Sequence, residues 1–124
     1  MSDELPVIGK DALRRVIKDW SVKPWWGIER KEIEWYPKIN YDKCIGCGVC
    51  YITCANRVVF DWDKEKKKPI VARPYNCVVA CTTCKMLCPV DALEFPDKEY
   101  IQKIMKEHKI LVKAKEILKK HNLI

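Results

Sequence analysis

Eight cysteines in two compact groups constrain this 124-residue chain more than any other feature of its sequence. The first group lies in "CIGCGVCYITC" and contains Cys44, Cys47, Cys50 and Cys54. The second lies in "CVVACTTCKMLCP" and contains Cys77, Cys81, Cys84 and Cys88. Cysteines this dense form either the disulfides of a secreted protein or a metal site. The start, "MSDELPVIGK", has no apolar signal segment, and no run approaches the roughly 18 apolar residues of a membrane span. We therefore expect a cytoplasmic protein whose reduced thiols bind metal.

The spacing of the cysteines distinguishes between two kinds of metal site. A zinc finger or ribbon builds one tetrahedron from two ligand pairs that lie about a dozen or more residues apart. Here each group supplies four cysteines within about a dozen residues, and the first group begins C-x2-C-x2-C. Three thiolates this close can each bind a different iron of a cuboidal cluster, while a fourth, three residues further on, points away from it. Ligand number and spacing therefore favour iron–sulfur clusters over zinc.

The second cysteine group resembles the cluster loops of two known families. Its first part, C-x3-C-x2-C, resembles the radical SAM enzymes, and its last part, C-x2-C-x3-C-P, resembles a bacterial-type ferredoxin. The radical enzymes need a partial or full (β/α) barrel, and an eight-fold barrel takes about 250 residues. Their motif also leaves Cys88, Pro89 and the whole first group without a role. Residues 38–96 therefore resemble a bacterial-type two-cluster (2[4Fe-4S]) ferredoxin, with an extension at each end.

The resemblance implies a crossed set of cluster ligands, in which each group lends its fourth cysteine to the other cluster. Cluster I would be bound by Cys44, Cys47, Cys50 and Cys88. Cluster II would be bound by Cys77, Cys81, Cys84 and Cys54. The protein would then be a ferredoxin or a small electron-transfer subunit of a cytoplasmic oxidoreductase. It would have no catalytic site of its own, and its partners would be redox proteins.

Two positions depart from the family pattern. Cys77 and Cys81 are separated by three residues where the family usually has two, which alters the backbone around cluster II. Ala55 follows Cys54 where the family usually has proline, which cannot donate a backbone N–H. Two interpretations of Ala55 stay open: its N–H donates toward a cluster sulfur and raises the potential, or it points elsewhere.

The alternative from a different class is a zinc-binding nucleic-acid interaction module, suggested by basic charge and aromatic residues. The formal charge of +7 counts every cysteine as neutral. Eight thiolates and two oxidised clusters, each core carrying two positive charges, lower this value by four to about +3. The sequence therefore disfavours nucleic acid as a partner. The sequence also contains a cationic turn formed by Lys64, Lys66, Lys67 and Lys68. It is either a solvated hairpin tip or a docking patch for an acidic redox partner.

An internal repeat predicts the fold of the core. "INYDKCIGCGVCYITCANRVVFD" and "RPYNCVVACTTCKMLCPVDALEFPD" align cysteine to cysteine, which indicates a duplicated unit. Each copy predicts a strand, a cluster loop, a short helix and a strand, and residues 58–63 and 69–73 predict a hairpin between the copies. The expected class is α+β, with a ferredoxin-like duplicated (βαβ)2 core.

The two flanking segments are predicted as extensions of a domain that covers residues 38–96. In residues 1–37, apolar side chains spaced i, i+3, i+4, i+7 (Leu13, Val16, Ile17 and Trp20) predict an amphipathic helix, followed by a Trp-rich arm. Residues 97–124 predict one long helix or two short ones. We expect the extensions to shield the clusters, the alternative being that one of them docks a partner. His108 and His121 lie outside both cysteine groups and are not expected to bind metal.

Overall fold

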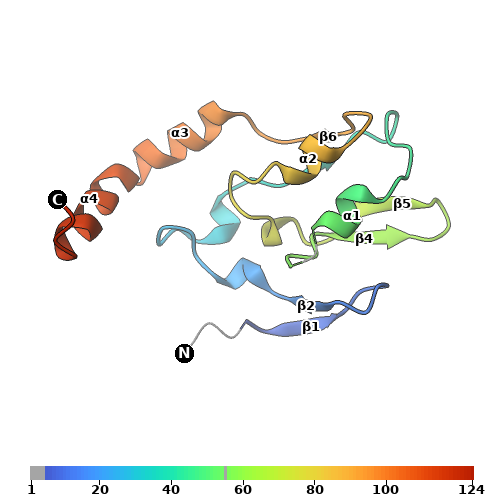
Figure 1. The fold of residues 1–124 in the computed structure, drawn as a ribbon, viewed down its shortest axis with the longest axis horizontal. Coiled ribbons are helices and arrows are strands. Elements are labelled where there is room, and N and C mark those ends of the chain that lie inside the picture. Colours follow the sequence, from blue (N-terminus) through green and yellow to red (C-terminus); the bar gives the residue numbers. More distant parts are fainter. Residues whose placement is uncertain (1–4, 55) are drawn as a thin grey trace.

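The structure is a computed structural model that describes residues 5–54 and 56–124. Its centre is a small α+β unit, which confirms the predicted fold class (Figure 1). In chain order this unit contains β3 (Lys38–Ile39), α1 (Val49–Thr53), β4 (Phe60–Asp63), β5 (Lys68–Val71), α2 (Thr83–Leu87) and β6 (Leu93–Glu94). The inner strands β4 and β5 pair antiparallel, and so do the outer strands β3 and β6. The pairing of β3 with β6 brings the two ends of the cysteine-containing region together.

The hairpin of β4 and β5 confirms the sequence prediction, with slightly shorter strands. Val58 has a positive φ of 49°, so the first strand begins only at Phe60. At the other end of β4, the Asp63 carboxylate accepts the backbone N–H groups of Glu65 and Lys66 and closes the turn. Phe60 is 1% exposed and anchors the hairpin in the core.

The tip of this hairpin packs on the first cysteine loop. Gly46 has a φ of 70°, and a Cβ atom there would collide with the backbone carbonyl of Lys67. The Lys68 ammonium donates to the backbone carbonyl of Cys44. The cationic turn is therefore partly a structural element: Lys68 is half-buried, while Lys64, Lys66 and Lys67 are exposed.

The predicted N-terminal helix is wrong, because residues 7–18 form a β-hairpin. Its strands are β1 (Val7–Lys10) and β2 (Val16–Lys18), which pair antiparallel at the edge of the molecule (Figure 1). The Asp11 carboxylate accepts the backbone N–H groups of Leu13 and Arg15, and these bonds close the turn of the hairpin. Of the four apolar side chains in the pattern only Ile17 is buried, at 6% exposure.

The Trp-rich arm runs from the hairpin into the core without regular strands. It contains two turns of 3-10 helix, Trp20–Val22 and Arg30–Glu32. Ile33 is fully buried, and Trp35, 4% exposed, stacks on Phe95 with ring centroids 5.4 Å apart. The arm therefore supplies part of the hydrophobic core of the cysteine-containing unit.

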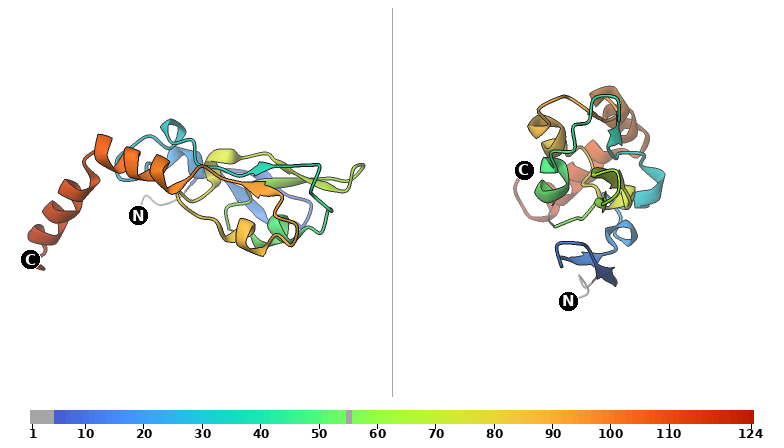
Figure 2. Two further views of the ribbon diagram at one scale, coloured as in Figure 1. Left: turned by 90° about the horizontal axis from the view of Figure 1, so that it is seen from above. Right: turned by 90° about the vertical axis from the view of Figure 1, so that its right-hand side faces the viewer.

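The C-terminal segment forms two helices, as one of the two sequence alternatives predicted. They are α3 (Lys98–Glu107) and α4 (Ile110–Lys120), separated by Lys109 with a φ of 54°. Ile104 and Ile110 are buried, but apolar side chains further along α4, such as Leu111 and Ile117, are exposed, and α4 bends away from the rest of the molecule (Figure 2). His108 is half-buried, and His121 is exposed. No helix within residues 5–54 and 56–124 is long and apolar enough to cross a lipid bilayer.

Candidate metal centres

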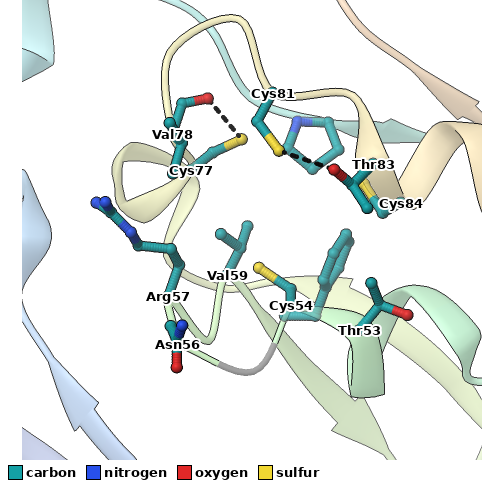
Figure 3. A pocket seen from close by; sticks show the side chains of 12 residues that line it. Thr53, Cys54, Asn56, Arg57, Val59, Cys77, Val78, Cys81, Thr83 and Cys84 are labelled. Atoms are coloured by element: carbon teal, nitrogen blue, oxygen red, sulfur yellow. Dashed lines mark hydrogen bonds between the residues drawn. The ribbon is translucent and has the colours of Figure 1, made fainter.

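The larger of two cysteine-lined cavities lies between α1, the loop after Pro74 and α2. Its volume is about 330 Å³, and it is lined by Cys54, Cys77, Cys81 and Cys84. The sulfur atoms of Cys54, Cys77 and Cys81 point into it from different sides (Figure 3). Cys54 comes from the first cysteine group and the other three from the second. We call this hollow the large cavity.

The second hollow, here called the small cavity, has a volume of about 20 Å³. Its cysteines are Cys44, Cys47, Cys50 and Cys88. Three belong to the first group, and Cys88 comes from the second. Apolar side chains including Ile39, Val90 and Leu93 complete its lining. The structure thus brings the eight cysteines together in the crossed arrangement that the sequence predicted for the ligands.

The crossing follows from how the cysteines are placed on α1 and α2. Cys50 and Cys84 lie in the first turns of the two helices, while Cys54 and Cys88 are the residues that end them. Four residues of helix advance the chain by about 6 Å, so the two cysteines of one helix reach different places. Because α1 and α2 pack against each other, the last cysteine of each helix lies beside the other group.

Burial and mutual repulsion disfavour the ionised form of the thiols. Burial, with the charges of neighbouring cysteines, raises the pKa of Cys50 to about 11 and those of Cys77 and Cys84 to about 12. Cys84 interacts with both Cys54 and Cys50, so the two cavities are close neighbours. Metal binding would deprotonate these thiols and release their protons.

Backbone N–H groups already point at sulfur atoms of both cysteine groups. The N–H of Ala92 donates to Cys88 Sγ at 3.3 Å. Burial raises the pKa of the Cys54 thiol, and a hydrogen bond from the backbone of Val59 opposes this shift. Such bonds stabilise the thiolate relative to the thiol, and the thiolate is the form that binds metal. Ala55, for which the sequence left two interpretations, lies outside the described residues.

The donor sets fit a cuboidal iron–sulfur cluster. Four cysteines line each cavity, which is one thiolate for each iron of a [4Fe-4S] cluster. Among residues 5–54 and 56–124, no group of three or more His, Cys, Asp or Glu side chains lies close enough to hold a single metal ion. The fit of the large cavity rests on both its volume and its donors, and that of the small cavity on its donors.

Sequence reasoning missed the side chains that hold the second cysteine loop. Arg30 is only 4% exposed, and its Nη2 donates to the backbone carbonyl of Cys77 at 2.8 Å. The Trp35 Nε1 donates to the carbonyl of Cys81 at 3.1 Å. Both donors come from the N-terminal arm and support the loop that carries the extra residue. A lone arginine or tryptophan has no spacing signal, so the sequence could not reveal these roles.

Asn76, the residue before Cys77, ties the same loop to two other segments. It is 2% exposed, and its amide nitrogen donates to the carbonyls of Lys18 and Arg57, each at 2.9 Å. Its amide oxygen accepts the backbone N–H of Trp20 at 3.0 Å. One amide therefore fixes the start of the second cysteine loop against the N-terminal hairpin and the chain after α1.

A second contact of the N-terminal hairpin covers the end of α1. Arg15 donates from both terminal nitrogens to the carbonyl of Tyr51, each at 3.2 Å, and its guanidinium lies 4.8 Å from the centre of the Tyr51 ring. The Asp11 side chain, 1% exposed, pairs with Arg15 at 2.6 Å. Burial works to raise the pKa of Asp11, but hydrogen bonds from Arg15 outweigh it and the pKa is lowered. The cation satisfies carbonyls at the negative end of the helix that leads to Cys54.

The fold and the two four-thiol cavities define a small iron–sulfur protein of the two-cluster kind. A family model described as "4Fe-4S dicluster domain" matches residues 43–107, which are 65 of the 124 residues. The chain belongs to this family.

Relatives with known names point the same way. An uncharacterized ferredoxin of Methanocaldococcus jannaschii is 41% identical over 75 residues, which cover 60% of this chain and 49% of the relative. Ferredoxin-3 of Nostoc is 35% identical over 74 residues, covering 44% of this chain and 75% of the relative. The NAD-dependent dihydropyrimidine dehydrogenase subunit PreA of Escherichia coli is 32% identical over 106 residues, covering 82% of this chain. The chain thus spans about half of the first relative and 25% of the last. No solved structure matches the chain significantly.

These matches confirm two predictions from the sequence, the two-cluster ferredoxin family and two [4Fe-4S] clusters as cofactors, and they support a role in electron transfer. They give no support to the zinc-binding nucleic-acid module. They do not test which cysteines bind which cluster.

Proposed function

We propose that the protein transfers electrons through two [4Fe-4S] clusters held by crossed sets of cysteines. Cluster II takes Cys54 with Cys77, Cys81 and Cys84, and cluster I takes Cys88 with Cys44, Cys47 and Cys50. The observation that carries this proposal is the exchange of the last cysteine of each group between the two cavities.

The clusters supply the chemistry, since each takes up and gives back one electron. The residues of the chain hold the clusters, limit water around them and keep them close together. Cys50 and Cys84 lie on the packed helices α1 and α2, so the two cavities are close neighbours and the route for the electron between them is short. No other group of the protein has to react.

The duplicated (βαβ)2 core is part of this proposal. The order β3, α1, β4 repeats as β5, α2, β6, and each unit places one helix after its cysteine loop. The pairing of β3 with β6 and of β4 with β5 is compatible with a pseudo-two-fold relation between the units. We propose residues 38–96 as the cluster domain, with residues 1–37 and 97–124 as extensions. The family match continues to residue 107, within α3.

We further propose that the protein is a carrier or a small subunit without a catalytic site, and that it works in the cytoplasm. Its partners are redox proteins that supply and accept electrons. The name of the E. coli relative, a subunit of a dehydrogenase, supports the subunit role. The exposed lysines of the cationic turn lie beside the small cavity, because the turn packs on its cysteine loop, and they suit a partner with an acidic surface.

Substitution of single cysteines by serine tests the crossed assignment of the cluster ligands. Anaerobically purified protein should contain about eight irons and eight sulfides, and dithionite should give the EPR signal of interacting reduced clusters. Cys88→Ser should damage the cluster of Cys44, Cys47 and Cys50, and Cys54→Ser the other. If each substitution damages the cluster of its own sequence group, the crossed assignment is wrong.

A further inference from the structure

Two arginines beside the large cavity have no acidic partner. Arg30 is buried, and its hydrogen bonds go to the backbone carbonyls of Cys77, Ile33 and Trp35. Arg57 lies at the edge of the same cavity and is half-buried (Figure 3). In the part of the chain that the structure describes, neither guanidinium forms an ion pair with Asp or Glu.

An unpaired charge in a buried place needs a compensating charge. Removing a cation from water costs several kcal/mol unless an anion and hydrogen bonds replace the solvent, as a general rule. The carbonyl groups satisfy the N–H donors of Arg30 but bring no negative charge. The Tyr75 ring, 5.5 Å from the Arg30 guanidinium, adds a cation–π contact but no full negative charge, so an anion bound near Cys77 would supply the compensating charge.

Arg57 is held in place by an aromatic ring and by its own backbone. Its guanidinium lies 3.5 Å from the centre of the Trp20 ring, and Asn76 donates to its backbone carbonyl at 2.9 Å. In this position its charge interacts with the thiols of Cys54, Cys77 and Cys81, which are three of the four cysteines of the large cavity. Arg30 interacts with the thiol of Cys77 as well.

We infer that Arg30 and Arg57 are the counter-ions of cluster II and raise its reduction potential, so that this cluster is reduced before cluster I. The inference rests on the proposed function. A [4Fe-4S] cluster with four thiolates carries a net charge of about −2, and about −3 once reduced, so a nearby cation stabilises the reduced form more.

The surroundings of the small cavity are different. The Lys68 ammonium donates to the carbonyl of Cys44 from a half-buried position on the hairpin. Lys85, on α2, is neutralised by Asp91 at 2.9 Å near the surface. The cations near the small cavity are lysine ammonium groups at or near the surface, whereas the two guanidinium groups beside the large cavity are held in place and one of them is buried. Two cations in less solvent give cluster II the higher potential.

Substitution of Arg57 tests the inference, because Arg57 is less buried than Arg30 and its removal leaves the carbonyls of the second cysteine loop satisfied. In protein-film voltammetry of the anaerobic holo-protein, Arg57→Gln should lower the more positive of the two potentials. We expect the ratio of reduced to oxidised cluster II at fixed applied potential to fall roughly tenfold, which is 59 mV for one electron. Arg57→Lys keeps the charge and should shift the potential by less than half as much.

Two further variants separate the charge of Arg57 from other effects. Lys18→Gln removes the same charge from an exposed position next to Arg57 and should change the ratio less than about twofold, because solvent screens it. Trp20→Leu releases the guanidinium toward solvent and should lower the same potential by less than Arg57→Gln does. If Arg57→Gln protein loses a cluster, the shift of the more positive potential in Trp20→Leu protein tests the inference instead.

The results that would overturn the inference are distinct from a failure of the proposed function. Arg57→Gln protein with its full iron, sulfide and EPR signals but unchanged potentials would refute it. So would a shift of the more negative potential alone, or one no larger than that of Lys18→Gln. Wild-type protein that binds no pair of [4Fe-4S] clusters would instead refute the proposed function.

Discussion

Trp35→Phe should selectively weaken the cluster of the large cavity. The indole Nε1 donates to the carbonyl of Cys81 at 3.1 Å, and the residue is 4% exposed, so phenylalanine leaves a buried carbonyl without its donor. An unsatisfied buried group costs about 1–3 kcal/mol, and the lost part of the ring adds roughly 1 kcal/mol. The second cysteine loop should therefore open more easily by about 2–4 kcal/mol. Since 1.4 kcal/mol is about a factor of ten, we expect iron loss at least tenfold faster.

The assay is iron release to a chelator under anaerobic conditions, followed by cluster absorbance and EPR. Only about half of the iron should leave faster, since the hydrogen bond of Trp35 reaches the loop of one cavity. Trp26→Phe is the matched control, because Trp26 is 38% exposed and its side chain donates no hydrogen bond to the residues that the structure describes. Equal release rates in the two variants, or faster loss of all the iron at once, would refute this reasoning.

Four further predictions concern other segments of the chain. Asp11→Asn should destabilise the protein at pH 7, measured by thermal unfolding. The pKa of Asp11 is lower in the folded protein than its value of about 3.9 in the unfolded chain, so the ionised carboxylate stabilises the fold above that pH. This stabilisation is lost as the pH falls through the folded pKa, so the difference in stability between variant and wild type should shrink near pH 3. A difference that does not depend on pH would contradict this. Gly46→Ala should reduce occupancy of the small cavity alone, because alanine is strained at a φ of 70° and its Cβ meets the Lys67 carbonyl; full iron content in this variant would contradict the packing of the hairpin tip. Deletion of residues 111–124 should leave both reduction potentials unchanged and the rate of bleaching in air within about twofold of wild type, because α4 beyond Ile110 is exposed. Deletion of residues 1–27 should speed bleaching, because Arg15 and Trp20, which contact the cluster domain, are lost with it.

Several features of the protein follow from the sequence alone. The spacing of the cysteines predicted two clusters of the ferredoxin type, since ligand number and separation are set by the geometry of the metal group. Two strand-like runs around a charged turn predicted the β4–β5 hairpin, and the spacing of apolar residues after Pro96 predicted the C-terminal helices. These signals are local, so they can be read within a few residues. The crossed binding of Cys54 and Cys88 stays a prediction, although each lies in the cavity that it requires.

The tertiary structure decided what covers the clusters and what charge surrounds them. The apolar spacing of residues 13–20 indicated a helix, but the Asp11 carboxylate accepts the Arg15 N–H while the Asp11 N–H donates to the Arg15 carbonyl, and these bonds close a hairpin turn. Arg30 and Asn76 each bind segments from elsewhere in the chain: Arg30 reaches Cys77, and Asn76 reaches Lys18. Arg57 acquires its position only by stacking on Trp20, which belongs to the N-terminal arm. Hydrogen bonds and charges between segments far apart in the chain leave no periodic pattern, so only the folded structure shows them.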